Sequence, residues 1–168
     1  YALNAESGRE VWRYSYPCSA GDYGGPRSSP AVAGNQLFTV SREGLVVCLS
    51  TTNGKALWTR NLQRELGAAP PRWGFAGSPL VEGNRVYVNI GTSGAALDRA
   101  SGKVLWWTGR DASGYASPVM HRTGGRPGLA IFTATGIASV DPTTGRRQWF
   151  HPWSTSYEVN AADPIFNG

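Results

Sequence analysis

The feature that most constrains this chain is an eleven-residue pattern that occurs four times along its 168 residues. The copy at residues 96–106 reads Ala-Leu-Asp-Arg-Ala-Ser-Gly-Lys-Val-Leu-Trp, and every copy keeps the glycine, a basic residue after it and the final tryptophan. The four glycine–tryptophan pairs are Gly8 and Trp12, Gly54 and Trp58, Gly102 and Trp106, and Gly145 and Trp149. The tryptophans are separated by 46, 48 and 43 residues, a period that indicates a repeat protein whose units stack on one another.

A second motif recurs in the same order between these copies. It is a short polar residue followed by proline, at Ser29-Pro30, Ser78-Pro79, Ser117-Pro118 and Asp163-Pro164. Proline is tolerated at the start of a strand, and in the first complete unit the two-residue turn Gly34-Asn35 follows shortly after it. Alternating apolar residues and turn signals then predict four strands in this unit, at about 29–33, 36–41, 45–50 and 55–61.

The residue types of the repeat have physical reasons. A short polar side chain that can bond to the backbone begins the last turn of each unit, at Asn4, Ser50, Asp98 and Asp141. The glycine supplies a left-handed conformation. The tryptophan, on the outer strand, can bury about 150–250 Å² against a neighbouring sheet. Because a four-stranded sheet of about 45 residues cannot cover both its faces, we predict an all-β fold, a β-propeller of four-stranded antiparallel blades.

The bulk composition fits this fold and excludes several other classes. Apolar residues make up 40% of the chain and charged residues 16%, so we do not expect a disordered chain. No apolar run approaches the roughly 20 residues of a transmembrane helix. The net charge of +5 comes almost entirely from arginines that are spread along the chain, with Arg146-Arg147 as the one doublet. Since nucleic-acid-binding proteins cluster such charge, we expect no nucleic-acid partner.

The two cysteines permit one disulfide at most. Cys48 lies in the apolar run 45–49, at a position where the other copies have alanine or serine, and is expected to be a small buried residue. Cys18 lies in a loop of proline, serine and glycine. We do not expect these two residues to be joined.

These motifs resemble those of a known family. The pattern Ala-x-Asp-x-x-x-Gly-Lys/Arg-x-x-Trp is the signature of the pyrroloquinoline-quinone (PQQ)-like propeller repeat, and residues 96–106 match it throughout, while the other copies vary at the first or third position. Residues 72–79 and 157–164 also look typical of bacterial PQQ-binding-like repeat proteins. The resemblance implies a ring of seven or eight blades, of which this chain would hold about three to four. The partners of these blades would then be the remaining blades of the same protein chain, and the location would be periplasmic or extracellular.

We therefore expect residues 1–168 to form a single partial propeller domain. Its expected parts are the end of a blade plus a loop at 1–27, blades at 28–61, 78–109 and 117–150, and the first strand of a next blade at 162–168. The chain opens inside a repeat, so we expect its true N-terminus to be missing. Because open sheet edges pair readily, we also predict that the chain made alone aggregates or dimerises through its edges.

Function is expected in the connections that precede each proline of the second motif, because in a propeller they cross one face towards the central channel. These connections combine aromatic residues with charged and amide side chains, and such residues are seldom collected in exposed loops without a role. The candidate ligand-binding residues are Asp22, Tyr23, Arg27, Arg72, Trp73, Phe75, Tyr115, Tyr157, Glu158 and Asn160. Their composition suits a pocket for a protein partner or a small planar or sugar-like ligand. The alternative is that the aromatic rings only pack beneath the loops.

The resemblance also raises PQQ-dependent dehydrogenation. Enzymes of that kind hold the quinone over a tryptophan, bind calcium through Glu, Asn and Asp, and many that oxidise alcohols have a disulfide between adjacent cysteines. This chain has no Cys-Cys pair, and Glu158 and Asn160 supply two of the about 6–8 oxygens that calcium takes. His121 and His151 are not at zinc-ligand spacing. We assign no catalytic residue and no metal site, and expect no cofactor, with PQQ and calcium kept as the alternative.

Three functions follow in order of preference. The first is a non-catalytic platform in the bacterial cell envelope that binds a ligand or a protein through its loop face. The alternative is a PQQ- and calcium-dependent quinoprotein dehydrogenase that acts on alcohols or sugars. The third is an extracellular carbohydrate-binding module, which only the aromatic loops support.

Overall fold

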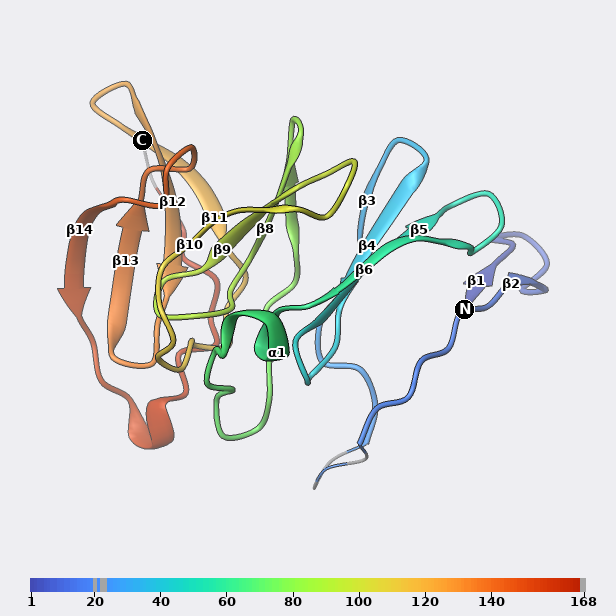
Figure 1. The fold of residues 1–168 in the computed structure, drawn as a ribbon, viewed down its shortest axis with the longest axis horizontal. Helices are drawn as coiled ribbons and strands as arrows, with labels where there is room; N and C mark the ends of the chain where they lie inside the picture. The colour runs from blue at the N-terminus through green and yellow to red at the C-terminus, as the bar shows by residue number, and fades with distance from the viewer. Residues whose placement is uncertain (20, 22–23, 167–168) are drawn as a thin grey trace.

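The computed structural model describes residues 1–19, 21 and 24–166, and it contains a two-stranded sheet followed by three four-stranded sheets (Figure 1). The two-stranded sheet pairs β1 (Ala2–Leu3) with β2 (Glu10–Trp12). The first four-stranded sheet consists of β3 (Ala31–Ala33), β4 (Gln36–Val40), β5 (Leu45–Ser50) and β6 (Ala56–Asn61). The second consists of β7 (Leu80–Glu82), β8 (Arg85–Val88), β9 (Ala95–Asp98) and β10 (Val104–Trp107). The third consists of β11 (Val119–Thr123), β12 (Arg126–Phe132), β13 (Gly136–Val140) and β14 (Arg147–Pro152). All pairs are antiparallel and follow chain order, which confirms the predicted fold class.

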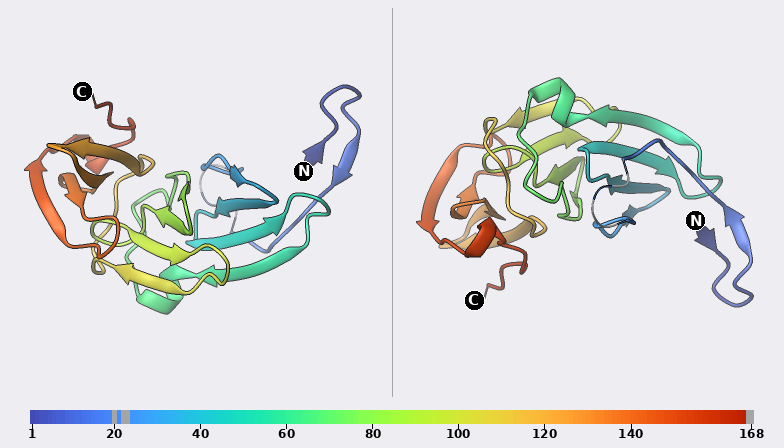
Figure 2. Two further views of the ribbon diagram at one scale, coloured as in Figure 1. Left: turned by 90° about the horizontal axis from the view of Figure 1, so that it is seen from above. Right: turned by 90° about the horizontal axis from the view of Figure 1, so that it is seen from below.

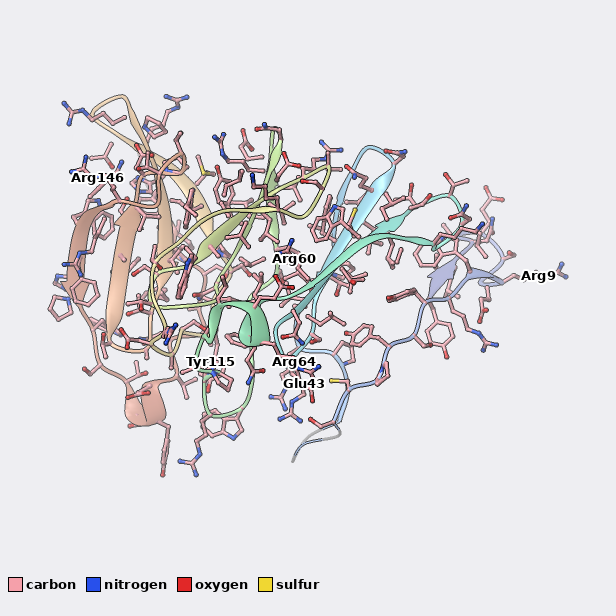
Figure 3. All side chains as sticks on the ribbon, viewed as in Figure 1. Arg9, Glu43, Arg60, Arg64, Tyr115 and Arg146 are labelled. Carbon is pink, nitrogen blue, oxygen red and sulfur yellow. The ribbon has the colours of Figure 1, made fainter. Side chains whose placement is uncertain are left out.

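The sheets stand side by side in an arc, like neighbouring blades of a propeller (Figure 2). The first strand of each four-stranded sheet lies on the concave side of the arc and the last strand on the convex side. The two ends of the chain lie at the two ends of the arc (Figure 2). The arginines are spread along it, with Arg9 and Arg146 at opposite ends and Arg60 and Arg64 near its middle (Figure 3).

The turns have the conformations that the sequence predicts. Gly34, Gly83 and Gly124, which begin the first hairpin turn of each four-stranded sheet, have φ angles of 59°, 58° and 57°. In the last turn of the third sheet, Asp98 Oδ1 accepts hydrogen bonds from the Ser101 hydroxyl at 2.6 Å and from the Ser101 N–H at 2.8 Å. These two bonds hold the pKa of the Asp98 carboxyl below its usual value.

The hydrophobic core lies between the sheets. In β8, Val86 and Val88 point into the core shared with the β3–β6 sheet, while Tyr87 points into the core shared with the β11–β14 sheet. The β7–β10 sheet is therefore buried on both faces, as a blade inside a stack must be. Cys48 is fully buried in the first of these cores, as predicted from its apolar run.

The repeat tryptophans join each sheet to the next. Trp58 Nε1 donates a hydrogen bond to Arg99 O at 2.9 Å, and its ring covers Gly102 so closely that a Cβ there would lie 2.7 Å from the ring. Two observations therefore favour glycine at position 102. Its φ of 71° is left-handed, and the tryptophan of the preceding sheet occupies the space that a Cβ would need. The equivalent contacts join Trp12 to Thr51 O and Gly54, and Trp106 to Pro142 O and Gly145.

The polar residues of the second motif form another set of links near the concave side. Ser29 N donates to Ser78 Oγ at 2.9 Å, Ser78 N donates to Ser117 Oγ at 3.2 Å, and Ser117 N donates to Asp163 Oδ1 at 2.6 Å. Each of these residues donates its backbone N–H to the side chain of the equivalent residue in the next repeat. This pattern explains why a short polar side chain recurs before the proline.

Two features differ from the sequence-based expectation. Helix α1 (Leu62–Leu66) was not predicted; it is stabilised by Asn61, whose side chain accepts from Arg64 N, and it ends at Gly67 with φ 67°. Residues 162–166 form no strand among the described residues, so the predicted first strand of a next blade is not seen here and stays a prediction. A strand needs a hydrogen-bonding partner, and no described strand pairs with this one.

Besides α1, the described residues contain one short 3-10 segment, η1 (Ser156–Glu158). Neither segment has the length and apolar character that a membrane-spanning helix requires.

Candidate functional site

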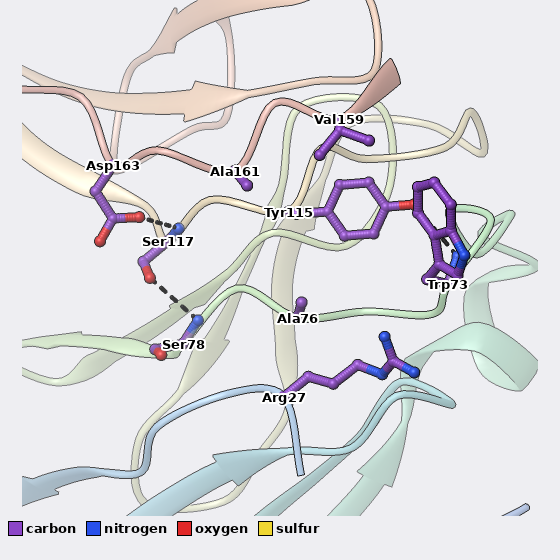
Figure 4. Close-up of a pocket in the computed structure, with 9 residues that line it drawn as sticks. All are labelled: Arg27, Trp73, Ala76, Ser78, Tyr115, Ser117, Val159, Ala161 and Asp163. Atoms are coloured by element: carbon purple, nitrogen blue, oxygen red, sulfur yellow. Dashed lines mark hydrogen bonds between the residues drawn. The ribbon is translucent and has the colours of Figure 1, made fainter. Parts of the chain in front are cut away.

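A pocket of about 780 Å³ opens where the connections between sheets meet (Figure 4). Its walls come from four connections: β2 to β3, α1 to β7, β10 to β11, and the segment after β14. The lining residues are Arg27, Trp73, Ala76, Ser78, Tyr115, Ser117, Val159, Ala161 and Asp163. Three of the candidate residues, Arg27, Trp73 and Tyr115, thus lie together although the sequence separates them widely.

An aromatic cluster is built around Trp73 and Tyr115, which line this pocket, and extends beyond it to Tyr157 and Arg72. The ring centroid of Trp73 lies 5.9 Å from that of Tyr115 and 6.3 Å from that of Tyr157. The Tyr115 hydroxyl oxygen accepts a hydrogen bond from Trp73 N at 3.2 Å. The Arg72 guanidinium lies 5.4 Å from both the Trp73 and the Tyr157 ring centroids. Ring–ring and cation–π contacts hold these side chains in place, so aromatic and cationic groups are presented to solvent with little freedom to move.

The turn at Tyr157 is conformationally strained. Tyr157 and Glu158 have φ angles of 60° and 59°, in the left-handed region that ordinary residues avoid at a cost of about 1–2 kcal/mol each. The turn leaves the Tyr157 side chain 69% exposed while its ring still contacts Trp73. Strain of this kind persists where the surrounding structure fixes the backbone, and it is concentrated at functional sites.

The remaining candidate residues have other places in the structure. Phe75 is fully buried in the core beside the β3–β6 sheet, so the packing alternative applies to this ring. Asn160 is buried, and its amide donates to Thr133 O at 2.9 Å, which ties the loop after β14 to the end of β12. Glu158 lines a separate hollow with Asp111. Asp22 and Tyr23 lie outside the described residues.

The described residues do not fit the calcium site of the quinoprotein alternative. Both polar atoms of the Asn160 side chain already make hydrogen bonds. Its amide nitrogen donates to backbone oxygens, and its Oδ1, the atom that would bind a cation, accepts from Thr155 Oγ1 at 3.2 Å. Glu158 is exposed. Within the described ranges, no three His, Cys, Asp or Glu side chains come together as metal ligands. Glu158 and Asn160 therefore do not form a cation site with these neighbours.

Both cysteines are free thiols. Cys18 is exposed, whereas Cys48 is buried, and burial raises the pKa of the Cys48 thiol to about 11. A thiol with such a pKa carries little thiolate near neutral pH, which fits a packing role for Cys48.

Sequence reasoning missed the part of the pocket formed by Ser78, Ser117 and Asp163. The motif that contains them was recognised, but only as the start of a strand. Since each of these residues also accepts a hydrogen bond from the preceding repeat, the motif lies at the base of the pocket as well as in the framework of the arc.

Four sheets in an arc, joined by Trp–Gly contacts and with their connections meeting on one face, define a β-propeller of PQQ-like repeats. The chain belongs to the family described as outer membrane protein assembly factor BamB, whose sequence profile matches residues 1–166. No curated protein matches the sequence significantly.

Solved structures with the same fold include BamB, alcohol dehydrogenases and a designed protein. BamB from Moraxella catarrhalis is 24% identical, with a TM-score of 0.58 over 84% of this chain and 39% of that one. Quinohemoprotein alcohol dehydrogenase from Comamonas testosteroni is 21% identical, with a TM-score of 0.58 over 76% of this chain and 21% of that one. The computationally designed protein Ika8 is 14% identical, with a TM-score of 0.63 over 95% of this chain and 44% of that one. These likenesses concern the fold, and this chain spans less than half the length of each.

Proposed function

We propose that this chain is a non-catalytic binding platform of the bacterial cell envelope and that its loop-face pocket holds a segment of a partner protein. The observation that carries the proposal is the meeting of four separate connections around one open pocket that Trp73, Tyr115 and Arg27 line. Arg72 and Tyr157 pack against Trp73 beside it. The family description, an outer membrane protein assembly factor, supports the envelope location and a protein partner.

The chemistry of the pocket favours a partner segment with aromatic and acidic side chains. Trp73, Tyr115 and Tyr157 offer ring surface, and Arg72 and Arg27 supply positive charge. Aromatic and arginine side chains are the residue types that contribute most binding energy at protein interfaces.

The acidic group in the pocket does not cancel this preference. Asp163 lies across the pocket from Trp73 (Figure 4), and its Oδ1 accepts the Ser117 N–H at 2.6 Å. A partner carboxylate therefore meets arginines at the aromatic wall, and that is where we place the recognition of acidic side chains.

The experiment is a titration of the chain with a panel of short synthetic peptides, monitored by tryptophan fluorescence. The panel contains peptides with aromatic and acidic residues, matched peptides with lysine in place of the acids, and simple sugars. We expect the aromatic–acidic peptides to bind best. Trp73→Ala should weaken this binding by about 30-fold or more, the loss typical of an aromatic anchor.

Trp153→Ala is the matched control, because Trp153 is a 55% exposed tryptophan that does not line the pocket. It should leave peptide binding unchanged. Equal binding by all peptides, or binding that survives Trp73→Ala, would contradict the proposed site, and selective sugar binding would favour the carbohydrate-binding alternative.

The quinoprotein alternative shares the fold of the alcohol dehydrogenase structures. It is tested by adding PQQ and calcium to the chain and to any longer form of the protein. A bound-quinone absorption spectrum together with alcohol-dependent dye reduction would overturn the non-catalytic platform.

A further inference from the structure

We infer that a groove between the outer strands β10 and β14 is a second binding site. It holds an extended peptide segment that has acidic side chains at one end and basic side chains at the other. The groove lies between two neighbouring sheets of the chain, and both sheets contribute to its walls. It shares no lining residue with the pocket around Trp73, so the inference does not depend on the proposed function of that pocket.

Two hollows of about 370 and 410 Å³ make up the groove, and Thr92, Ser93 and Arg147 line both of them. The first hollow reaches the turn between β13 and β14 at Thr144, and the second reaches the turn between β12 and β13 at Thr135. Because successive turns of an antiparallel sheet lie at opposite ends, the groove runs the height of the β11–β14 sheet. The six residues of β14 span about 20 Å, a length that suits an extended segment of similar size.

The equivalent junction between the first two four-stranded sheets is closed. Val104 and Trp107 of β10 pack against the core of that junction, and Leu62 of α1 is fully buried in it. In β14 the equivalent positions, two residues after the repeat glycine and one after the repeat tryptophan, are Arg147 and Phe150. Both are exposed, and the connection after β10 forms no helix. The groove is therefore open because the residues that would fill it differ, although a sheet stands on each side.

The charges of the groove are separated along its length. Arg146 and Arg147 line the hollow that reaches the β13–β14 turn, and Arg146 lies at that end of the sheet in Figure 3. Asp111 and Glu158 line the hollow at the other end. Among the described residues, no ion pair joins either arginine to either carboxylate. The two ends of the groove can therefore attract opposite charges of one ligand.

The wall between the two ends is polar and ordered. Ser93 is 6% exposed, and its hydroxyl makes no hydrogen bond within the described part of the chain, so it can bond to an N–H or C=O of an occupant. Thr92 Oγ1 donates to Asp111 Oδ2 at 3.1 Å and so fixes the orientation of this carboxylate. The Arg147 guanidinium lies 5.6 Å from the Phe150 ring centroid, a cation–π contact that holds the arginine along the strand.

An extended peptide fits all of these features. Its backbone supplies donors and acceptors along the wall, and its side chains can place carboxylates and ammonium groups at opposite ends of one short segment. A neutral sugar would leave both charged ends of the groove unpaired. A purely acidic or purely basic peptide would satisfy one end and be repelled by the other.

The test is fluorescence anisotropy of labelled peptides of about eight residues with blocked termini. One peptide has two glutamates at one end, two lysines at the other, and serine and threonine between them. A second peptide has the same residues, but glutamate and lysine alternate. We expect the first peptide to bind about 10-fold more tightly, because only its charges match both ends of the groove. Simple sugars should not displace it.

Charge substitutions then assign each end of the peptide to one end of the groove. Arg147→Gln should weaken binding of the first peptide by about 10-fold, because a charge-assisted contact is lost. This loss should disappear when glutamines replace the glutamates of the peptide, and should persist when they replace its lysines. Asp111→Asn should show the opposite dependence on the two ends of the peptide.

Arg122→Gln is the matched control, since Arg122 is an exposed arginine of the same sheet that lines neither hollow and its loss changes the net charge equally. It should leave binding unchanged. Trp73→Ala should also leave this binding unchanged, which separates the groove from the loop-face pocket. Circular dichroism of each variant monitors folding.

Four results would overturn the inference. The first is that neither peptide binds, or that both bind equally well. The second is a loss in Arg147→Gln that does not depend on the glutamates of the peptide. An equal loss in Arg122→Gln would show attraction by net charge alone, and displacement by simple sugars would assign the groove to a carbohydrate.

Discussion

Trp106 and Trp149 occupy the same position in consecutive repeats, but their surroundings differ. Trp106 is 8% exposed, donates its indole N–H to Pro142 O at 3.0 Å, and covers Gly145 of the next sheet. Trp149 is 37% exposed and covers no glycine of a following sheet in the described part of the chain. The motif therefore stabilises the fold only where a neighbouring sheet supplies the glycine turn. The role of the motif is to join neighbouring sheets.

The largest expected effect is the loss of an internal tryptophan. Trp106→Ala should lower the free energy of unfolding by about 3–5 kcal/mol, because a ring packed between two sheets is replaced by a cavity. Trp149→Ala should lower it by less than Trp106→Ala does, because Trp149 is 37% exposed and packs on its own sheet alone among the described residues. Urea unfolding of the two variants and the wild type measures both values. Equal losses would mean that the two tryptophans do not differ as described.

The glycines should show the same contrast with a smaller effect. Alanine at Gly102 or at Gly8 costs about 1–2 kcal/mol, since both turns are left-handed. At Gly102 the new methyl group also meets the Trp58 ring, which adds about 1–3 kcal/mol of overpacking. We therefore expect Gly102→Ala to be the more destabilising variant in urea unfolding. A Gly8→Ala variant that loses as much would indicate that the turn around Gly8 is already covered.

The links on the concave side provide a third contrast. Ser78→Ala removes the acceptor of the Ser29 N–H and should cost about 1 kcal/mol in thermal or urea unfolding. Ser29→Ala removes a hydroxyl that no described residue uses, so the monomer should lose almost nothing. Equal losses of stability in the two variants would contradict the hydrogen bond from the Ser29 N–H to the Ser78 hydroxyl as the link between these repeats.

The smallest effect concerns pH and the terminal sheet. Burial lowers the pKa of His121, whose Nε2 lies 2.8 Å from Ser139 Oγ. The unfolded chain therefore takes up a proton at His121 before the folded chain does. Stability should be unaffected by this group above a pH of about 6.5, and should decrease as the pH falls from there towards the lower pKa of the folded state. His121→Asn should remove this part of the decrease when urea midpoints are measured across that range.

Much of the fold could be predicted from the sequence, because its signals are local and repeated. Turns at Gly34 and Gly83 and the spacing of the tryptophans were sufficient to predict antiparallel four-stranded sheets. Helix α1 could not be predicted in this way, since five residues carry no clear period and the helix depends on its caps at Asn61 and Gly67.

The candidate site was harder to predict than the fold. The sequence identified the connections, but residues within one connection have opposite roles: Trp73 lines the pocket and Phe75, two positions later, is in the core. Asn160, a candidate ligand-binding residue, is buried and anchors a loop through the Thr133 carbonyl oxygen. Such differences depend on which side chains face the neighbouring sheet, and that is decided by contacts between residues far apart in the sequence.

The most direct test of the Trp–Gly junction is hydrogen exchange of the tryptophan indole N–H groups, followed by NMR and assigned with single Trp→Phe variants. In the monomer, the Trp12, Trp58 and Trp106 indoles donate across sheet junctions at 2.8, 2.9 and 3.0 Å and should exchange slowly, whereas Trp149 should exchange rapidly. A Trp149 indole as protected as that of Trp106 in the monomer, or a Trp106 indole that exchanges as rapidly as that of Trp149, would contradict the account.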